Sequence, residues 1–235
     1  MLFSRDEVSS YVNQNFEPVW QSVRPVPVIR IDFGNGQVVT RTLHGNIATY
    51  ACTADGQVLD ILPGIYAPAA YLDGLKQLRL LANYADQQGK ANRAGRLRDY
   101  HQAQAAALKK NDPPPRLVNM ADMSKRRIEG GIKAVLMPGQ AGRPVPAPAD
   151  PKNGFGLRTT EDIANWKALA EDTRQNEAVR RRQIHEMLAA DQPLRPEQMT
   201  KLLYKEVLHA DLDDPYLGLG ETLFANYPFK DEKPR

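Results

Sequence analysis

Residues 16–64 carry nearly all of the strand signals in this 235-residue sequence, beginning with the apolar, β-prone run Phe16-Glu-Pro-Val-Trp-Gln-Ser-Val23. Two alternating runs follow it, Val28-Ile-Arg-Ile-Asp-Phe33 and Val38-Val-Thr-Arg-Thr-Leu43. Between them stands Asn35-Gly36, which predicts a two-residue type I′ hairpin turn, because both central residues of that turn need positive φ. We therefore expect a strand at 16–23 and an antiparallel hairpin after it.

A second pair of strands is predicted at residues 47–53 and 57–62. Ala54-Asp-Gly56 supplies the turn between them, and Pro63-Gly64 stops the second strand. Because everything after residue 64 reads as helical or irregular, we expect the strands of residues 16–62 to make up one sheet. The fold class predicted in this way is α/β.

Apolar periodicity and capping signals predict five helices. They lie at residues 4–16, 68–84, 93–110, 160–190 and 197–210. Ser4 is expected to cap the first helix, since Glu7 completes a capping box. The helix at 93–110 has only a thin apolar face, so we expect it to be largely exposed. The last helix has a predicted buried stripe made of Met199, Leu202, Leu203 and Val207.

The proline-rich stretch 138–151 is the best candidate for a linker, because prolines make a chain stiff and extended. It predicts four segments: a module at 1–84, a helical or irregular connecting region at 85–137, the linker itself, and a helical C-terminal region at 152–235. Within the connecting region, residues 132–137 fit either a short strand or a buried turn of helix. The end of the chain is aromatic, and we expect this tail to be buried on the rest of the protein; it contains Leu223, Phe224, Tyr227 and Phe229.

The composition excludes several classes of protein. No run approaches the about 20 apolar residues of a membrane span, and residues 1–7 lack the apolar core of a signal peptide. A net charge of +3 is too small to indicate a nucleic-acid partner. Cys52 is the single cysteine, so an internal disulfide, a C-x-x-C pair and a cysteine-rich zinc site are excluded for this chain. We expect a cytoplasmic protein, or a periplasmic or secreted one if an N-terminal extension precedes Met1.

The module at 1–84 resembles a thioredoxin-like domain in three places. The segment after the family's active-site helix resembles Phe3-Ser-Arg-Asp-Glu-Val8 with Asn13-Gln-Asn-Phe16. The family's central strand and Asp-Gly turn resemble Gly45-Asn-Ile-Ala-Thr-Tyr-Ala-Cys-Thr-Ala-Asp-Gly56. Its last strand and closing helix resemble Val58-Leu-Asp-Ile-Leu-Pro-Gly64 and Tyr71-Leu-Asp-Gly-Leu75. The resemblance implies an incomplete thioredoxin-like fold, sheet plus helices, with a mainly helical C-terminal extension.

Two features of that family are missing from this sequence. The family's redox C-x-x-C would lie before Phe3, at the start of a helix that lowers the thiol pKa, and Ile47 stands where the family has a cis-proline. The resemblance therefore implies a redox-inactive protein that acts in protein binding or scaffolding, with another protein as partner and no cofactor. The alternative is a thiol–disulfide oxidoreductase whose catalytic C-x-x-C segment lies upstream of Met1. For this chain by itself, we lean against an enzyme.

Candidate reactive groups are few. Cys52 lies in the middle of a predicted strand, where we expect a small buried apolar residue, with a reactive thiol as the alternative. Glu206 and His209 have the i, i+3 spacing of ligands in di-iron helical bundles, and Asp213 follows closely. Such a site needs a second Glu-x-x-His, which this sequence lacks. We therefore expect these residues to end a helix and begin a turn, and we expect no metal.

A basic run is the remaining candidate. Arg180-Arg-Arg182, together with Arg174 and His185, has the charge to bind phosphates. A charge run on a long helix is usually a solvated face, and that is what we expect here.

Overall fold

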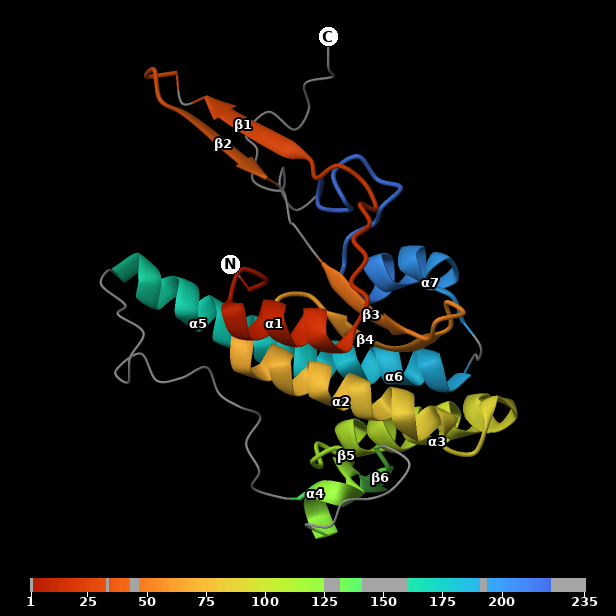
Figure 1. Ribbon diagram of the computed structural model, residues 1–235. Coiled ribbons are helices and arrows are strands. Elements are labelled where there is room, and N and C mark those ends of the chain that lie inside the picture. Colours follow the sequence, from red (N-terminus) through yellow and green to blue (C-terminus); the bar gives the residue numbers. More distant parts are fainter. Residues whose placement is uncertain are drawn as a thin grey trace. The chain divides into compact units, whose positions relative to one another are not determined.

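Figure 1 shows the computed structural model of the protein, which describes residues 2–32, 34–42, 47–124, 132–140, 160–190 and 194–220. Contacts divide the chain into two units, Met1–Val19 with Ile47–Gln198 and Trp20–Asn46 with Met199–Arg235. Most of the linker expected at 138–151 and the whole aromatic tail lie outside the described residues. The division into four segments stays a prediction.

The described residues form three antiparallel pairs of strands. They are β1 (Val28–Asp32) with β2 (Val38–Thr42), β3 (Ala48–Cys52) with β4 (Val58–Pro63), and β5 (Arg116–Asn119) with β6 (Ala134–Met137). Both predicted hairpins are confirmed, and β6 shows that residues 132–137 contain a strand rather than a helical turn. With the helices described below, these pairs make the fold a mixture of helices and small sheets, consistent with the α/β prediction.

The prediction of one sheet is wrong for the described residues, because no pair of strands joins another pair. β4 is buried along its whole length. Helices α2 (Pro68–Asp86) and α6 (Arg181–Ala190) both pack against β4, so helices rather than further strands cover this hairpin.

The strand expected at 16–23 is also wrong, since this segment is irregular. Val19 and Trp20 are 92% and 87% exposed, so neither side chain packs against a sheet. Pro18 beside them lacks the N–H group that a ladder of strand hydrogen bonds requires.

The loop between β1 and β2 differs from the expected type I′ turn. Asp32 pairs with Val38, which leaves more than two residues in the loop. Asp32 Oδ1 accepts a hydrogen bond from Gly34 N–H at 2.9 Å, and Asn35 Oδ1 accepts one from Gln37 N–H at 3.0 Å. In these side-chain turns the aspartate and asparagine bond the backbone, and positive φ occurs at the two glycines of the loop instead of at Asn35.

Helices make up most of the rest of the described chain. Besides α2 and α6 they are α1 (Asp6–Asn15), α3 (Arg93–Lys109), α4 (Met120–Ser124), α5 (Thr160–Gln175) and α7 (Pro196–Leu202), with short segments η1 (Lys90–Asn92), η3 (Asn176–Arg180) and η4 (Leu203–Val207). The five predicted helices are confirmed, and α5, η3 and α6 together form the one expected at 160–190. The cap expected at Ser4 is wrong, because α1 begins one residue later. Arg5 is its N-cap, and no side chain caps it.

The buried stripe of the last helix is shifted from the prediction. Leu202 is exposed, whereas Tyr204 is buried with Leu203. The hydrogen bond from Leu208 N–H to Leu203 O, at 3.0 Å, spans five residues as in a π-helix and so adds one residue to the turn. The buried residues still follow i, i+3 and i+4 spacings, but the stripe includes Tyr204 and Leu208 in place of Leu202.

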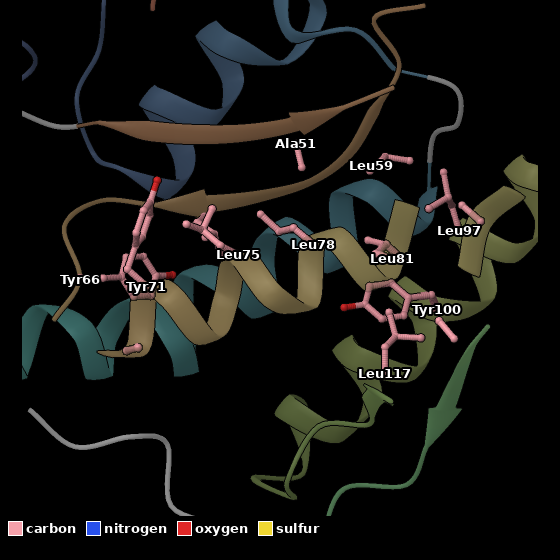
Figure 2. Packing of buried hydrophobic residues seen from close by; sticks show 14 of the residues in the cluster. Ala51, Leu59, Tyr66, Tyr71, Leu75, Leu78, Leu81, Leu97, Tyr100 and Leu117 are labelled. Carbon is pink, nitrogen blue, oxygen red and sulfur yellow. The ribbon is translucent and has the colours of Figure 1, made fainter. Parts of the chain in front are cut away.

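The apolar core of the first unit is arranged around α2 (Figure 2). Leu75, Leu78 and Leu81 project from α2 toward the β3–β4 hairpin. α3 and β5 add side chains to the same cluster, among them Leu97, Tyr100 and Leu117. Since burial of one leucine contributes about 1.5–3 kcal/mol, this cluster is a main source of the unit's stability.

Helix α3 is not the largely exposed helix that the sequence predicted. It packs against α6 and buries a face of mixed polarity, made of Arg93, Leu97, Tyr100, His101, Gln104 and Ala105. Apolar periodicity is weak on α3 because half of this buried face is polar. Burial of these polar side chains is tolerated because each has a hydrogen-bond partner. One of them, His101, belongs to the candidate functional site.

Candidate functional site

A cluster of buried polar side chains lies where β4, α3 and α6 meet in the first unit. Asp60 comes from β4, His101 from α3, and Arg181 and His185 from α6. Asp60, His101 and His185 are almost completely inaccessible to solvent. Because charged and titratable groups are rarely buried without partners, the contacts of this cluster determine what it can do.

Asp60 and Arg181 form a bidentate ion pair inside the protein. Arg181 Nη1 lies 2.6 Å from Asp60 Oδ1, and Nη2 lies 2.7 Å from Oδ2. Nη1 also donates to the carbonyl oxygen of Ile61 at 2.6 Å, and Ile61 N–H donates to Asp60 Oδ1 at 2.8 Å. Burial by itself raises the pKa of a carboxyl, but Arg181 and the nearby histidines hold the pKa of Asp60 below its ordinary value. The carboxylate is therefore charged at neutral pH.

The two histidines are bonded to each other. His101 Nε2 lies 2.9 Å from the carbonyl oxygen of Leu59, so Nε2 carries the proton and Nδ1 is left as an acceptor. His185 Nδ1 lies 2.8 Å from His101 Nδ1 and is the donor of that hydrogen bond. Burial lowers the pKa of His101 to about 4 against the opposing effect of Asp60, and burial and Arg181 put the pKa of His185 well below its ordinary value. Both rings are neutral at pH 7.

Tyr100 forms one wall of this cluster. Its ring meets His101 edge-on with centroids 5.1 Å apart, and it meets His185 edge-on at 6.0 Å. Such edge-to-face contacts fix the orientation of the imidazole rings. The two histidines therefore have little freedom to turn toward other partners.

Within the described chain, Asp60, His101 and His185 are the group of histidine, cysteine and acidic residues whose donor atoms lie close enough to suggest a metal ion, all within 4.8 Å of one another. Their contacts do not fit one. Two imidazole nitrogens on a tetrahedral zinc ion lie about 3.3 Å apart, given Zn–N bonds of about 2.0–2.1 Å, whereas these nitrogens are 2.8 Å apart. Arg181 also occupies both oxygens of Asp60. The cluster is a hydrogen-bonded network.

A π-helical segment, η3, holds the next part of the network. Asn176 Nδ2 donates to the carbonyl oxygen of Ile65 at 2.7 Å, and Asn176 Oδ1 accepts from Arg180 at 2.7 Å. Gly64 has a φ of +72°, and a Cβ there would lie 2.9 Å from Asn176 Oδ1, so this turn requires glycine. π-helical turns are frequent at functional sites, and η3 brings Asn176 into contact with the turn at Gly64 and Ile65.

Two further titratable groups, Tyr66 and Glu177, belong to this region, and Glu177 is a residue of η3. The hydroxyl of Tyr66 is buried and has no hydrogen-bond partner of good geometry. Burial, followed by the charge of the nearby Glu177, raises the pKa of Tyr66. Burial also raises the pKa of Glu177, with Arg181 opposing it and Asp73 adding to it.

Cys52 is exposed at the end of β3, so the expectation of a buried residue is wrong. Its neighbour Ala51 is buried, and the ladder shifts register between these two residues. Partial burial of the sulfur, followed by the charge of Glu197, raises the thiol pKa. The thiol is accessible but not activated.

The metal candidates at the end of the last helix belong to the second unit. Glu206 and His209 are exposed, and Asp213 pairs with Lys201 at 2.9 Å. His209 has a φ of +53°, the left-handed conformation of a helix C-terminal residue, which agrees with the expected helix end. The structure does not bring the three together as a metal-binding group.

The basic run does not form a phosphate-binding face. Arg181 is turned into the protein toward Asp60, and Arg180 donates to Asn176. Arg174 pairs with Glu171 at 2.6 Å on the surface, and Arg182 lies 4.0 Å from Glu186. Arg174, Arg181 and Arg182 lie near carboxylates, whereas Arg180 bonds a neutral amide. The expectation of a solvated face is wrong for Arg181 and His185, which are turned into the protein.

Sequence reasoning missed Asp60, His101 and Arg181 as a group, and it placed His185 in a basic patch. A local signal was present for the histidines. His101 follows Leu97 at i+4, and His185 lies between Ile184 and Leu188, so both occupy buried stripes. Local periodicity could not predict that the two histidines contact each other, because His101 and His185 are 84 residues apart in the sequence.

Comparisons with known proteins return no match: no family model, no curated protein and no solved structure matches this chain. Among the described residues, no helix is both long and apolar enough to cross a membrane. A functional assignment therefore depends on the chain's own geometry.

Proposed function

We propose that this chain is a redox-inactive protein that acts in protein binding or scaffolding, and that the β3–β4 hairpin with α2 belongs to an incomplete thioredoxin-like module. The observation that carries the proposal is the exposure of the irregular segment 17–27 and of Val28, the first residue of β1. Val19 and Trp20 have nearly all of their surface in solvent, and Val23, Val26 and Val28 are exposed as well.

An exposed apolar segment of this kind suits protein recognition. Soluble proteins seldom expose contiguous apolar surface, and tryptophan is enriched among the residues that dominate binding energy at interfaces. In this segment five large apolar side chains within ten residues, 19–28, are in solvent. A protein partner that buries Trp20 would remove the largest of them from water.

The second unit holds part of this segment in place before any partner binds. Arg24 Nη1 donates to the carbonyl oxygens of Leu212 and Asp214, at 2.8 and 2.6 Å. Pro25 and Pro27 restrict the backbone further, since proline fixes φ. A segment that is already ordered loses less conformational entropy on binding, which favours affinity.

Among the described residues, the two candidate reactive sites are poorly suited to catalysis. The polar cluster of Asp60, His101 and His185 is closed to solvent, so a substrate cannot reach it without an opening of the helices. Cys52 is a single thiol with a raised pKa, and two-electron dithiol exchange needs a second thiol. The oxidoreductase alternative would require a C-x-x-C upstream of Met1.

The proposal is tested with a photo-crosslinking amino acid placed at residue 20 of the full chain, and with a second protein carrying it at Met123. Met123 is an exposed apolar residue on α4, which makes it a matched control. A protein that is captured only from residue 20 is then purified, and its affinity for the wild-type chain is measured by calorimetry.

Trp20→Ala should weaken that affinity about 30-fold, which corresponds to about 2 kcal/mol for a residue at the centre of an interface. Met123→Ala should leave it unchanged. Equal affinity of the wild-type and Trp20→Ala chains would contradict the proposal. Reduction of insulin disulfides by the purified chain would contradict the redox-inactive part.

A further inference from the structure

We propose that the His101–His185 pair is a proton-operated latch, which holds α3 against α6 at neutral pH and releases the two helices in mildly acidic solution. The latch belongs to the first unit and does not depend on the binding function proposed above. Three features of the structure carry it: the donor–acceptor pattern of the two rings, the charge already present around them, and their position between two helices.

The hydrogen-bond pattern allows the contact only while His101 is neutral. His101 Nε2–H is committed to the carbonyl oxygen of Leu59, so a second proton on this ring must go to Nδ1. His101 Nδ1 is the atom that accepts the hydrogen bond from His185 Nδ1–H at 2.8 Å. With protons on both nitrogens, two donors would face each other at that distance. Protonation of His101 therefore replaces the hydrogen bond by a repulsion.

The surroundings of the pair disfavour protonation of either imidazole ring. The groups that face the pair are Asp60 from β4, Arg181 from α6 and the ring of Tyr100 from α3. Arg181 already neutralises Asp60 through two hydrogen bonds. A proton on either histidine would leave one uncompensated positive charge in a site closed to solvent, which is strongly unfavourable. Opening the helices lets solvent reach the charge.

The position of the pair connects this chemistry to the fold. His101 and His185 lie 84 residues apart in the sequence and join the middles of α3 and α6, two helices that pack extensively on each other. The same face of α3 carries the core residues Leu97 and Tyr100. Separation of α3 from α6 would expose this apolar surface. The latch therefore controls access to part of the core.

The direction of the pH effect follows from linkage. Burial lowers the pKa of His101 from 6.5 to about 4 in the closed form, and that of His185 is lowered too. Between these pH values the opened form binds more protons than the closed form, so opening becomes more favourable as the pH falls. The opening equilibrium rises by up to about tenfold per pH unit for each proton taken up.

Hydrogen exchange of the full chain at pH 7.5 and pH 5.0, corrected for the intrinsic pH dependence of amide exchange, tests the latch. Peptides from α3 and α6 should lose protection by at least about tenfold at pH 5.0. Peptides from the β1–β2 hairpin should not change. Equal protection of α3 and α6 at the two pH values would overturn the proposal.

Variants separate the latch from general acid unfolding. The double variant His101→Gln with His185→Gln keeps groups that donate and accept hydrogen bonds but cannot take up a proton at these pH values, so α3 and α6 should stay protected at pH 5.0. His209→Gln, which changes an exposed histidine, should respond to pH as the wild type does. An unchanged pH response in the double variant would overturn the latch.

A measurement on the wild-type chain covers the case in which the double variant does not fold. Imidazole signals of His101 and His185, followed by NMR from pH 7.5 to pH 4, should change together with the loss of protection of α3 and α6. Titration of both rings near pH 6.5 without any opening would overturn the proposal. So would bound zinc, or a shift of the pH response on addition of EDTA, because either would show that a metal rather than a proton joins the two rings.

Discussion

At the scale of single residues, Cys52 shows how one position on a strand sets the chemistry of a thiol. Successive side chains on a strand point to opposite faces, so the burial of Ala51 goes with the exposure of Cys52. Glu197 lies near enough to disfavour the thiolate, and the raised pKa follows from this charge together with partial burial of the sulfur. The result is a thiol that solvent reaches but that reacts slowly.

A labelling experiment at this scale checks the effect of Glu197. Cys52 should react completely with a disulfide reagent in the native protein at pH 7, because the side chain is exposed. Glu197→Gln should react faster and show a lower thiol pKa, because the variant removes the negative charge. The rate is measured as a function of pH, with Glu206→Gln as a control remote from the thiol in sequence. Identical rates for the wild type and Glu197→Gln would show that the charge has no effect.

At the scale of elements, the first unit depends on polar contacts between secondary-structure elements as well as on apolar packing. The ion pair of Asp60 and Arg181 connects β4 to α6 across 121 residues of sequence. Thr173 accepts a hydrogen bond from Ala67 N–H at 2.9 Å and so connects α5 to the turn before α2. The long helix at 160–190 is therefore attached to the β3–β4–α2 unit at several points.

Removal of one partner of the buried ion pair tests this attachment. Arg181→Met should lower the free energy of unfolding by about 3–5 kcal/mol, because it leaves the Asp60 carboxylate buried and unpaired. Combination with Asp60→Leu should recover most of that loss, since the double variant buries no charge. Both are measured by urea denaturation at pH 7.

Arg174→Met is the matched control on the same long helix, and it removes an exposed pair with Glu171. An exposed pair contributes little because solvent screens it, so this variant should change the free energy of unfolding far less than Arg181→Met does. If Arg181→Met were no more destabilising than Arg174→Met, the ion pair would not be a structural connection between β4 and α6.

At the scale of the whole molecule, the β3–β4 hairpin and α2 do not form a complete apolar core by themselves. Leu97, Tyr100 and Leu117, which lie beyond residue 84, belong to the same apolar cluster as the leucines of α2. α6 covers β4 as well. Residues 1–84, the segment in which we propose a thioredoxin-like module, therefore share their core with later parts of the chain.

A fragment containing residues 1–84 should accordingly lack a cooperative thermal transition, whereas the full chain should unfold cooperatively. The reason is that the fragment leaves the apolar faces of α2 and β4 in water. Circular dichroism and calorimetry on both proteins provide the comparison. A fragment that melts as sharply and at the same temperature as the full chain would show that residues 85–235 do not complete the core.

The sequence alone determined most of the local structure. Asp32, Gly34 and Gly36 make a turn between two β-prone runs, and Pro68 begins a helix that continues to Asp86. These features depend on interactions within a few residues, which local patterns describe well. The single cysteine likewise excludes dithiol chemistry within this chain on composition alone.

Only the tertiary structure decided which polar residues are buried and with which partners. Nothing near His101 in the sequence indicates His185, and nothing near Asp60 indicates Arg181, because each contact joins residues more than 80 positions apart. A prediction from local periodicity places polar residues in solvent. A polar group can be buried only when a partner forms a hydrogen bond with it, and here that partner is distant in the sequence. The polar face of α3, and with it the candidate latch, exists because the fold brings those partners together.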